Sequence, residues 1–419
     1  MSLLKLLKDK QKFFKKVPFY PFIMQYPTPD YWTNNFDISN IIEDLIDIDI
    51  NELNIYIHIP FCDYLCKYCS FSKILYNKKY KYLFLKKLEQ EIDFYDELYD
   101  FSSLDIKTIY IWWWTPTTLD IDDIKYIKDI FDRYNIKTSW EFTIETNPDR
   151  IDINKFKLWK EVWVNRISVW IQTFNNDILK LYNRWLLDYD MFVLKINQLR
   201  NIWYDNINFD MIYWFSSQTD IDVVNDIKHI KLLNPEHISY YPLILYDFLI
   251  KDKPNIPIFF EKLERQYDII KQELKWYYNF YTLEYASNKK WLKHDYQVNY
   301  LSWKNVLGLW PSWFSYIKNI WFKNKFSLFE YLKQKFFFIE YLYKVKDKII
   351  LAQKNFLMWI RLNKIIWKDI DYLKEYYNMD EIYNFFILDN NWYYVLKNEY
   401  LKYQDLLQYY FYNLFKSWK

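Results

Sequence analysis

Between residues 51 and 241 the chain alternates between short β-rich segments and longer amphipathic segments. The β-rich segments contain many Ile, Val, Tyr and Phe residues, which favour strands. The amphipathic segments repeat their apolar residues at the spacing of one helix face. Strands and helices that alternate in this way form a parallel sheet with right-handed crossovers, so an α/β fold is predicted. The predicted strands are residues 54–59, 106–111, 141–145, 166–171, 207–212 and 237–241, and the predicted helices are residues 76–99, 121–134, 154–161, 189–200 and 221–233.

The pattern changes on both sides of this region. Before residue 50, Pro18, Pro21, Pro27 and Pro29 prevent long helices, which predicts an irregular N-terminal arm. A long helix is predicted over residues 257–278, and after about residue 290 the alternation stops. The chain is therefore divided into an arm (residues 1–50), a core (residues 51–290) and a smaller, mainly helical C-terminal domain (residues 291–419) with a possible strand pair near residues 392–396.

Cys62, Cys66 and Cys69 form a C-x3-C-x2-C pattern in the loop after the first predicted strand. Three thiolates can bind three irons of a [4Fe–4S] cluster and leave the fourth iron open to a small molecule. A structural zinc site needs four protein ligands, and the one nearby candidate, His58, lies inside the strand. Zinc and a set of inert buried cysteines stay open as less favoured alternatives.

Composition adds exclusions and one anomaly. The net charge of +2 gives no field that would favour nucleic acid, and no apolar run of about 18 residues predicts a membrane span. The few clustered cysteines and the lack of an apolar leader segment favour the cytoplasm. The anomaly is the presence of 1 glycine and 21 tryptophans, since a chain of 419 residues needs many left-handed turns.

The segment HIPFCxxxCxYCxF, from His58 to Phe71, resembles the radical S-adenosylmethionine (SAM) enzymes, specifically the oxygen-independent coproporphyrinogen III oxidases and the related HemW-type haem chaperones. The resemblance implies a partial (β/α)6 barrel, with a [4Fe–4S] cluster on Cys62, Cys66 and Cys69 and SAM at the open iron. It also implies cleavage of SAM to a 5′-deoxyadenosyl radical. In the oxidases this radical chemistry converts two propionate groups to vinyl groups with loss of CO2.

Tryptophan stands where this family has glycine. The segment IWWWTPTT resembles the family's GGGTPT turn, and Trp163, Trp170, Trp214 and Trp313 fall at further glycine positions of the family, as do Trp185 and Trp310. Trp203, Trp359, Trp367 and Trp392 lie in turn-like contexts. Glycine and tryptophan together make up about 5% of the chain, near the ordinary glycine usage of about 7%. We therefore hypothesise that UGA codons read here as tryptophan encode glycine in the organism.

The resemblance also assigns residues to the SAM site. Arg184 is expected to bind the SAM carboxylate in bidentate fashion, and Asp210 to accept a hydrogen bond from a ribose hydroxyl. The other assigned positions lie in the loop and at successive strand ends, where α/β barrels carry their active sites. The full set is Tyr56, Tyr68, Trp112, Trp113, Thr115, Glu145, Gln172, Arg184 and Asp210.

The family resemblance does not choose between the functions found within the family. The segment MQYPTPDYW resembles the arm of the oxidases, but Phe71 stands where they usually have a further cysteine. The haem-binding motif of the chaperones is not intact, although His294 and Tyr300 lie in that region, and His229, His237 and His294 are interpreted as structural or surface residues. The first hypothesis is a porphyrinogen oxidase that receives electrons from flavodoxin or ferredoxin. A haem chaperone is the second, and a haem-degrading radical SAM methyltransferase is a remoter third.

The mass of the natural protein tests the codon hypothesis. Because glycine is lighter than tryptophan, we expect an intact mass several per cent below the 53.0 kDa of the chain as written. Mass spectrometry of protein purified from its organism measures this directly. A natural mass of 53.0 kDa would contradict the hypothesis.

Overall fold

The computed structural model describes residues 32–113, 119–243 and 256–416, apart from residues 36, 47, 70, 310, 312, 326, 335–337, 346, 381, 390, 398–399 and 401–403. Most of the predicted arm, together with Thr115 and Trp310, lies outside the described residues. Within them, no helix is long and apolar enough to cross a membrane.

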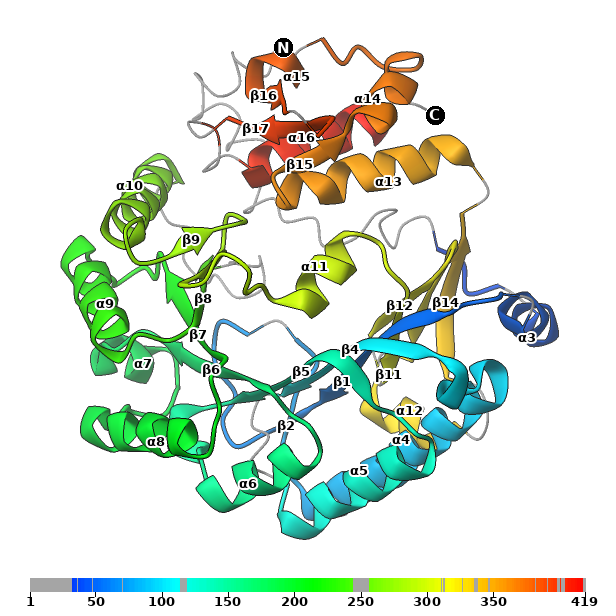
Figure 1. Ribbon diagram of the computed structural model, residues 1–419, viewed down its shortest axis with the longest axis horizontal. Coiled ribbons are helices and arrows are strands. Elements are labelled where there is room, and N and C mark those ends of the chain that lie inside the picture. The colour runs from blue at the N-terminus through cyan, green and yellow to red at the C-terminus, as the bar shows by residue number, and fades with distance from the viewer. Residues whose placement is uncertain are drawn as a thin grey trace.

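The core is a curved sheet with helices on its outer side (Figure 1). All six strands predicted from the sequence are present, and adjacent members pair in parallel in chain order. The partial barrel predicted for a radical SAM protein is thereby confirmed. Its parallel strands are β1 (Glu52–Ile59), β4 (Asp105–Trp113), β5 (Thr138–Thr146), β6 (Arg166–Gln172), β7 (Ile207–Tyr213) and β8 (His237–Pro242).

The outer helices cover the sheet because each presents an apolar face to it. The main buried cluster joins strand residues such as Ile109 and Phe209 to helix residues such as Ile127 and Phe192. Helix α5 begins with a capping box of Asp120 and Asp123, which satisfies its first N–H groups. The outer helices are α4 (Lys78–Tyr99), α5 (Ile121–Arg133), α6 (Ile153–Glu161), α7 (Asn176–Leu181), α8 (Tyr189–Asn201), α9 (Asp220–Leu233) and α10 (Ile256–Leu274).

The sheet extends beyond the predicted core, and this extension was not predicted from the sequence. It has 12 strands, and one edge is extended by β11 (Val306–Leu309), β12 (Phe314–Ile317), β13 (Ile320–Asn324) and β14 (Ile339–Lys344). Strand β11 pairs in parallel with β1, and the others follow as antiparallel hairpins. Residues 306–344 therefore belong to the same sheet as the core, although they fall within the predicted C-terminal domain. The opposite edge ends in β10 (Tyr285–Ser287) and β9 (Asn279–Phe280).

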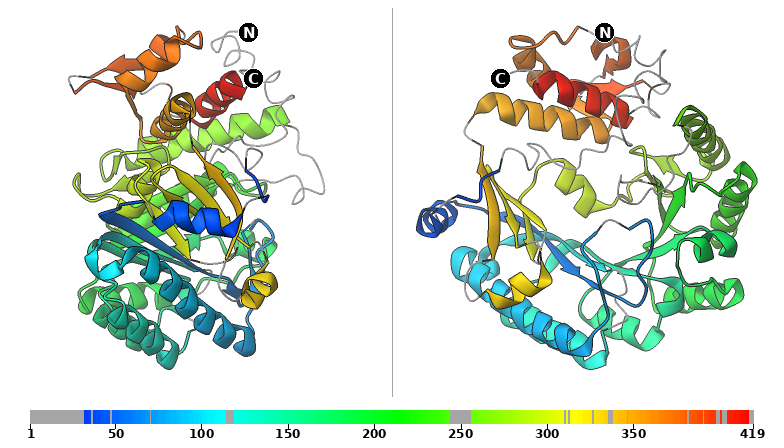
Figure 2. Two further views of the ribbon diagram at one scale, coloured as in Figure 1. Left: turned by 90° about the vertical axis from the view of Figure 1, so that its right-hand side faces the viewer. Right: turned by 180° about the vertical axis from the view of Figure 1, so that it is seen from behind.

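The remaining elements include a helical unit at one end of the molecule, in which α13 and α16 lie side by side (Figures 1 and 2). The predicted strand near residues 392–396 is found as β17, the middle of a three-stranded sheet. Helix α11 lies inside the curve of the large sheet. These elements are α3 (Ile38–Ile46), β2 (Phe61–Cys62), β3 (Ile74–Leu75), α11 (Asp295–Leu301), α12 (Leu328–Lys333), α13 (Lys348–Arg361), β15 (Lys364–Ile366), α14 (Trp367–Lys374), α15 (Ile382–Phe385), β16 (Phe386–Leu388), β17 (Tyr393–Leu396) and α16 (Gln404–Lys416).

Several tryptophans have a backbone conformation that suits glycine. A bulky residue with positive φ is a genuine outlier, because its Cβ crowds the backbone in the left-handed region. Trp163 and Trp214, which fall at glycine positions of the family, have φ values of 67° and 72°. Trp203 and Trp392, in turn-like contexts, have values of 68° and 61°, and Trp303 has 61°. This geometry supports the hypothesis that these residues are glycine in the natural protein.

Replacement of Trp203 by glycine should therefore stabilise the chain as written. Its side chain is 81% exposed, so little packing is lost, while relief of the left-handed conformation is worth about 1 kcal/mol. The free energy of unfolding in urea measures the gain. Trp276, which is 84% exposed and is not among the residues with positive φ, is the matched control, and Trp276→Gly should bring no gain. Equal effects of the two substitutions would contradict the interpretation.

Candidate functional site

The three cysteines lie in a fixed loop beside the carboxyl ends of the parallel strands. All three are buried, and they pack with Tyr68 against Trp170 of β6 and Ile212 of β7. The backbone N–H of Lys67 donates to the carbonyl of Tyr182 at 3.1 Å, which ties the loop to the end of α7. The Lys73 ammonium donates to the carbonyl of Cys66 at 3.2 Å. The loop is thus held by contacts that do not use the thiols.

The chemistry of these thiols fits an iron–sulfur cluster. Burial raises the pKa of Cys62 far above its ordinary value and that of Cys69 to about 11, so bound metal has to supply the charge that stabilises the thiolates. Among the described residues, no three Cys, His, Asp or Glu side chains converge on one point as a single metal ion would require. Three cysteines in one loop are the set of ligands that a [4Fe–4S] cluster with one open iron requires.

A cavity next to the loop brings together most of the assigned SAM residues. Its wall includes Cys69, and the other assigned residues come from the loop and from the barrel strands. The side chain of Trp113 and all of Thr115 lie outside the described residues. The assigned residues that line the cavity are Tyr56, Tyr68, Trp112, Glu145, Gln172 and Asp210.

Arg184 joins this cavity to the cysteine loop. Its guanidinium donates to the hydroxyl of Tyr68 at 2.8 Å and lies 3.5 Å from the sulfur of Cys66. It also donates to the carbonyl of Trp170 at 2.9 Å and to the side-chain oxygen of Asn147 at 3.2 Å. Arg184 itself does not line the cavity: the buried guanidinium lies behind Tyr68 and Trp170, which do.

The two carboxylates of the cavity have different environments. Glu145 at the end of β5 accepts a hydrogen bond from the Tyr110 hydroxyl. Asp210 in β7 accepts one from the Ser168 hydroxyl, and burial raises its pKa to about 6 despite this bond and the nearby Arg166 charge. The carboxylate oxygens of both residues can accept hydrogen bonds from hydroxyl or amino groups of a ligand.

Indole rings occupy part of the same cavity. Trp313 stacks on Tyr56 with ring centroids 4.0 Å apart, and Trp112 lies 5.2 Å from Trp313 and 6.1 Å from Trp170. A Cβ at Gly308 would lie 2.3 Å from an atom of the Trp313 ring, so this close approach depends on the one glycine of the chain. The polar residues fit SAM, whereas these indoles narrow the space that it would use. Glycine at positions 112, 170 and 313 would remove the conflict.

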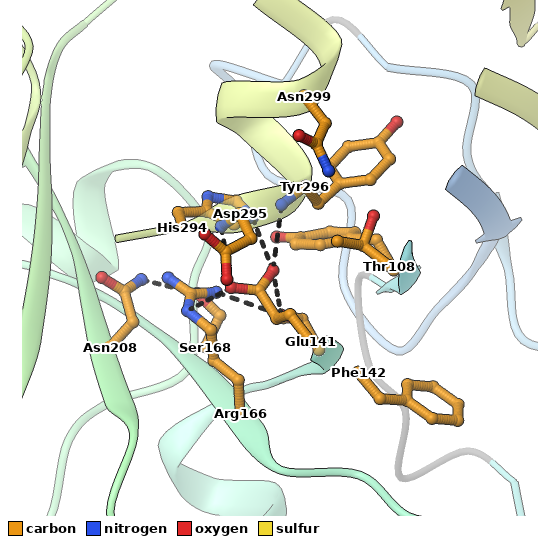
Figure 3. Close-up of polar contacts among 12 residues, drawn as sticks. Thr108, Glu141, Phe142, Arg166, Ser168, Asn208, His294, Asp295, Tyr296 and Asn299 are labelled. Atoms are coloured by element: carbon orange, nitrogen blue, oxygen red, sulfur yellow. Dashed lines mark hydrogen bonds and ion pairs between the residues drawn. The ribbon is translucent and has the colours of Figure 1, made fainter. Parts of the chain in front are cut away.

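A second group of polar residues lies deeper inside the barrel, and the sequence analysis assigned it no role (Figure 3). Arg166 is fully buried, 3.8 Å from the Glu141 carboxylate and 3.4 Å from the Nδ1 atom of His237. Glu141 accepts hydrogen bonds from the backbone N–H groups of Asp295 and Tyr296 at 3.0 and 3.3 Å. The carboxylate therefore holds the first turn of α11, whose later residues line the cavity.

Comparisons with known proteins agree with this geometry. The radical SAM superfamily model matches residues 56–230. The haem chaperone HemW of Bacillus subtilis is 32% identical over 228 residues, which are 52% of this chain and 59% of the relative. Oxygen-independent coproporphyrinogen III oxidase of Salmonella typhimurium is 28% identical over 223 residues, which are 53% of this chain and 48% of the relative. The chain thus matches about half of the length of these curated relatives.

Residues 56–230 thus match the radical SAM superfamily, the class of protein that uses a [4Fe–4S] cluster and SAM. The fold can be stated more narrowly. The solved structure of HemN, the coproporphyrinogen III oxidase of Escherichia coli, superposes with a TM-score of 0.77 at 19% identity, over 95% of this chain and 98% of that chain. The chain is thus related to both the HemW chaperones and the oxygen-independent oxidases.

Loss of one partner from the buried pair of Glu141 and Arg166 should be strongly destabilising. Glu141→Ala leaves a buried guanidinium without its carboxylate and α11 without its cap, which should lower the free energy of unfolding by about 3 kcal/mol. Urea denaturation measures the loss. As a control, Glu52→Ala removes the carboxylate from the exposed pair with Lys304 and should cost under about 1 kcal/mol. A loss from Glu141→Ala no larger than that of the control would contradict the role of Glu141.

Proposed function

We propose that the protein is a radical SAM oxidoreductase of the oxygen-independent coproporphyrinogen III oxidase type, which removes propionate carboxylates from a porphyrinogen. The observation that carries the proposal is a single cavity lined by Cys69 and by Tyr56, Glu145 and Asp210, with further residues from beyond the radical SAM domain. The close likeness of the fold to HemN over nearly the whole chain supports it.

In this proposal each assigned residue has a role. Cys62, Cys66 and Cys69 would hold the cluster, which with SAM would supply the radical chemistry of the reaction. Arg184 binds the SAM carboxylate, and Asp210 accepts a hydrogen bond from the ribose. The remaining assigned residues would surround the cofactor, and the family resemblance implies that Trp112, Trp113 and Thr115 would face its amino and carboxylate end. Tyr56, Tyr68, Glu145 and Gln172 complete this site.

The cavity, with its aromatic wall, would also limit the access of water to the reacting groups. Its wall is mostly aromatic, with Tyr56, Tyr110 and Tyr296 packed as a buried cluster. A dry site prevents solvent from quenching a reactive species and strengthens the few charge interactions inside it. Electrons reach the cluster from a protein donor such as flavodoxin or ferredoxin. The substrate is a porphyrinogen or haem-like small molecule rather than a nucleic acid.

Glycine at the tryptophan positions is part of the same proposal. The conflict between SAM and the rings of Trp112, Trp170 and Trp313 disappears when the side chains are removed. The same change relieves the left-handed backbone at Trp163 and Trp214. Two independent observations, ring crowding in the cavity and positive φ elsewhere, thus support one substitution pattern.

A haem chaperone of the HemW type is the second candidate. Its support is the 32% identity to HemW of Bacillus subtilis, together with Phe71 at the position where the oxidases usually have a further cysteine. Phe71 lines the cavity and packs against Trp112 with ring centroids 4.2 Å apart. Under this hypothesis, the same fold and cluster would be used to transfer haem.

One experiment separates the two candidates. We expect the full chain with glycine at the tryptophan positions to take up about four irons on anaerobic reconstitution, and then to cleave SAM when reduced. With coproporphyrinogen III it should form protoporphyrinogen, measured by chromatography. Cys66→Ser should lose iron and activity, whereas Ser72→Ala, in the same loop, should keep both.

The other outcomes have distinct meanings. A tight Soret shift on haem titration without protoporphyrinogen would support the chaperone function instead. A chain that takes up no iron and sulfide in any form would contradict both candidates and the cluster itself.

A further inference from the structure

Arg361 brings a positive charge to the cavity from outside the radical SAM domain. It is the last residue of α13, and its side chain lines the cavity while being only 3% exposed. Among the described residues that line the cavity, it is the one lysine or arginine. The other wall residues near it are aromatic, with Tyr285 of β10 and Tyr300 of α11 in the same wall. A buried cation in such a wall needs a specific anionic partner.

Glu284 is one such partner and fixes the position of the guanidinium. The two side chains form an ion pair at 2.7 Å, and Glu284 is itself 2% exposed. The backbone carbonyl of Glu284 accepts a hydrogen bond from the N–H of Tyr240 in β8 at 2.9 Å. This bond fixes the backbone that carries the Glu284 carboxylate. The carboxyl end of α13 adds a favourable dipole for the cation. Arg361 is thus preorganised rather than flexible.

We infer that Arg361 is a substrate-binding residue that anchors one carboxylate of an anionic, largely apolar ring substrate at the end of the cavity formed by α13 and β10. This inference rests on the proposed function and extends it to a named residue. A planar guanidinium has five N–H donors, so it can bind Glu284 on one side and a ligand carboxylate on another. The aromatic wall beside it provides the apolar surface that a ring substrate needs.

The two arginines of the site then have separate tasks. Arg184 contacts Cys66 and Tyr68 at the cluster end, in the place proposed for SAM. Arg361 comes from the end of α13 and pairs with Glu284, which directly precedes β10. A substrate that meets Arg361 with a carboxylate is therefore oriented before the reaction begins, which is how binding energy away from the reacting bond contributes to rate.

Binding of a stable substrate analogue tests this without turnover. The full chain, in whichever of the two forms the mass measurement identifies as natural, is titrated with coproporphyrin III and with its tetramethyl ester, and quenching of porphyrin fluorescence gives both dissociation constants. We expect Arg361→Met to weaken binding of the acid by about tenfold and to change binding of the ester by less than about twofold, because a charge-assisted bidentate contact is lost only for the acid. Arg361→Lys should give an intermediate loss, because an ammonium cannot bind in bidentate fashion.

Two control variants separate a binding role from a structural one. Lys354→Met removes another buried basic side chain from α13, one that donates to Tyr316 and does not line the cavity, and it should leave the acid-to-ester ratio unchanged. Glu284→Gln keeps the guanidinium but removes the competing negative charge, so binding of the acid should stay equal or become tighter. A purely structural ion pair would instead make Arg361→Met and Glu284→Gln weaken both ligands alike.

Each outcome decides the inference. Equal losses for the acid and the ester in Arg361→Met, or no loss at all, would overturn the role of Arg361 while leaving the proposed function in place. A natural chain that binds neither porphyrin nor haem would overturn the proposed function and this inference together.

Discussion

The buried contact between Glu141 and the start of α11 is the interaction on which the cavity depends. The carboxylate accepts two backbone N–H groups of that helix, and Arg166 lies beside the carboxylate inside the barrel. Further along the helix, Asn299 donates to the side-chain oxygen of Asn54 in β1 at 2.8 Å. A short helix that would not be stable alone is therefore fixed at two points inside the sheet. Its fixed position lets Tyr300 face the same space as the strand ends.

Backbone geometry imposes a second constraint on the same molecule. Parallel strands end at one edge, and the chain must then turn sharply to enter the next helix, which repeatedly needs positive φ. Gln172, at the end of β6, has a φ of 70°, and Trp214, directly after β7, has a φ of 72°. An indole at such a position is a genuine outlier, because the bulky side chain crowds the backbone. The turns that build the site are thus the places where the identity of the residue matters most.

The sequence predicted the part of the fold that has local signals. The six parallel strands and their helices could be predicted because each element carries its own periodicity, and the cysteine loop because its spacing is short and fixed. The four strands from Val306 to Lys344 were missed, since each has only four to six residues and a short apolar run does not distinguish a strand from a buried helix segment. Arg166 and Arg361 were not assigned, because their significance comes from partners at positions 141 and 284 that no local pattern connects to them.

The distribution of charge in the cavity limits what it can bind. Arg184 lies behind the wall at the cysteine loop, and Arg361 lines the wall in an ion pair with Glu284. Glu145 and Asp210 also line the wall and can accept hydrogen bonds. Burial leaves Asp210 with a pKa of about 6, so its carboxylate is mostly ionised at neutral pH and repels a second anion near it. A ligand carboxylate is therefore favoured only at the arginines, and the aromatic surface accepts an apolar body. A ring with acidic side chains at its rim meets these requirements, whereas a uniformly polar ligand would leave much of the aromatic wall without a partner.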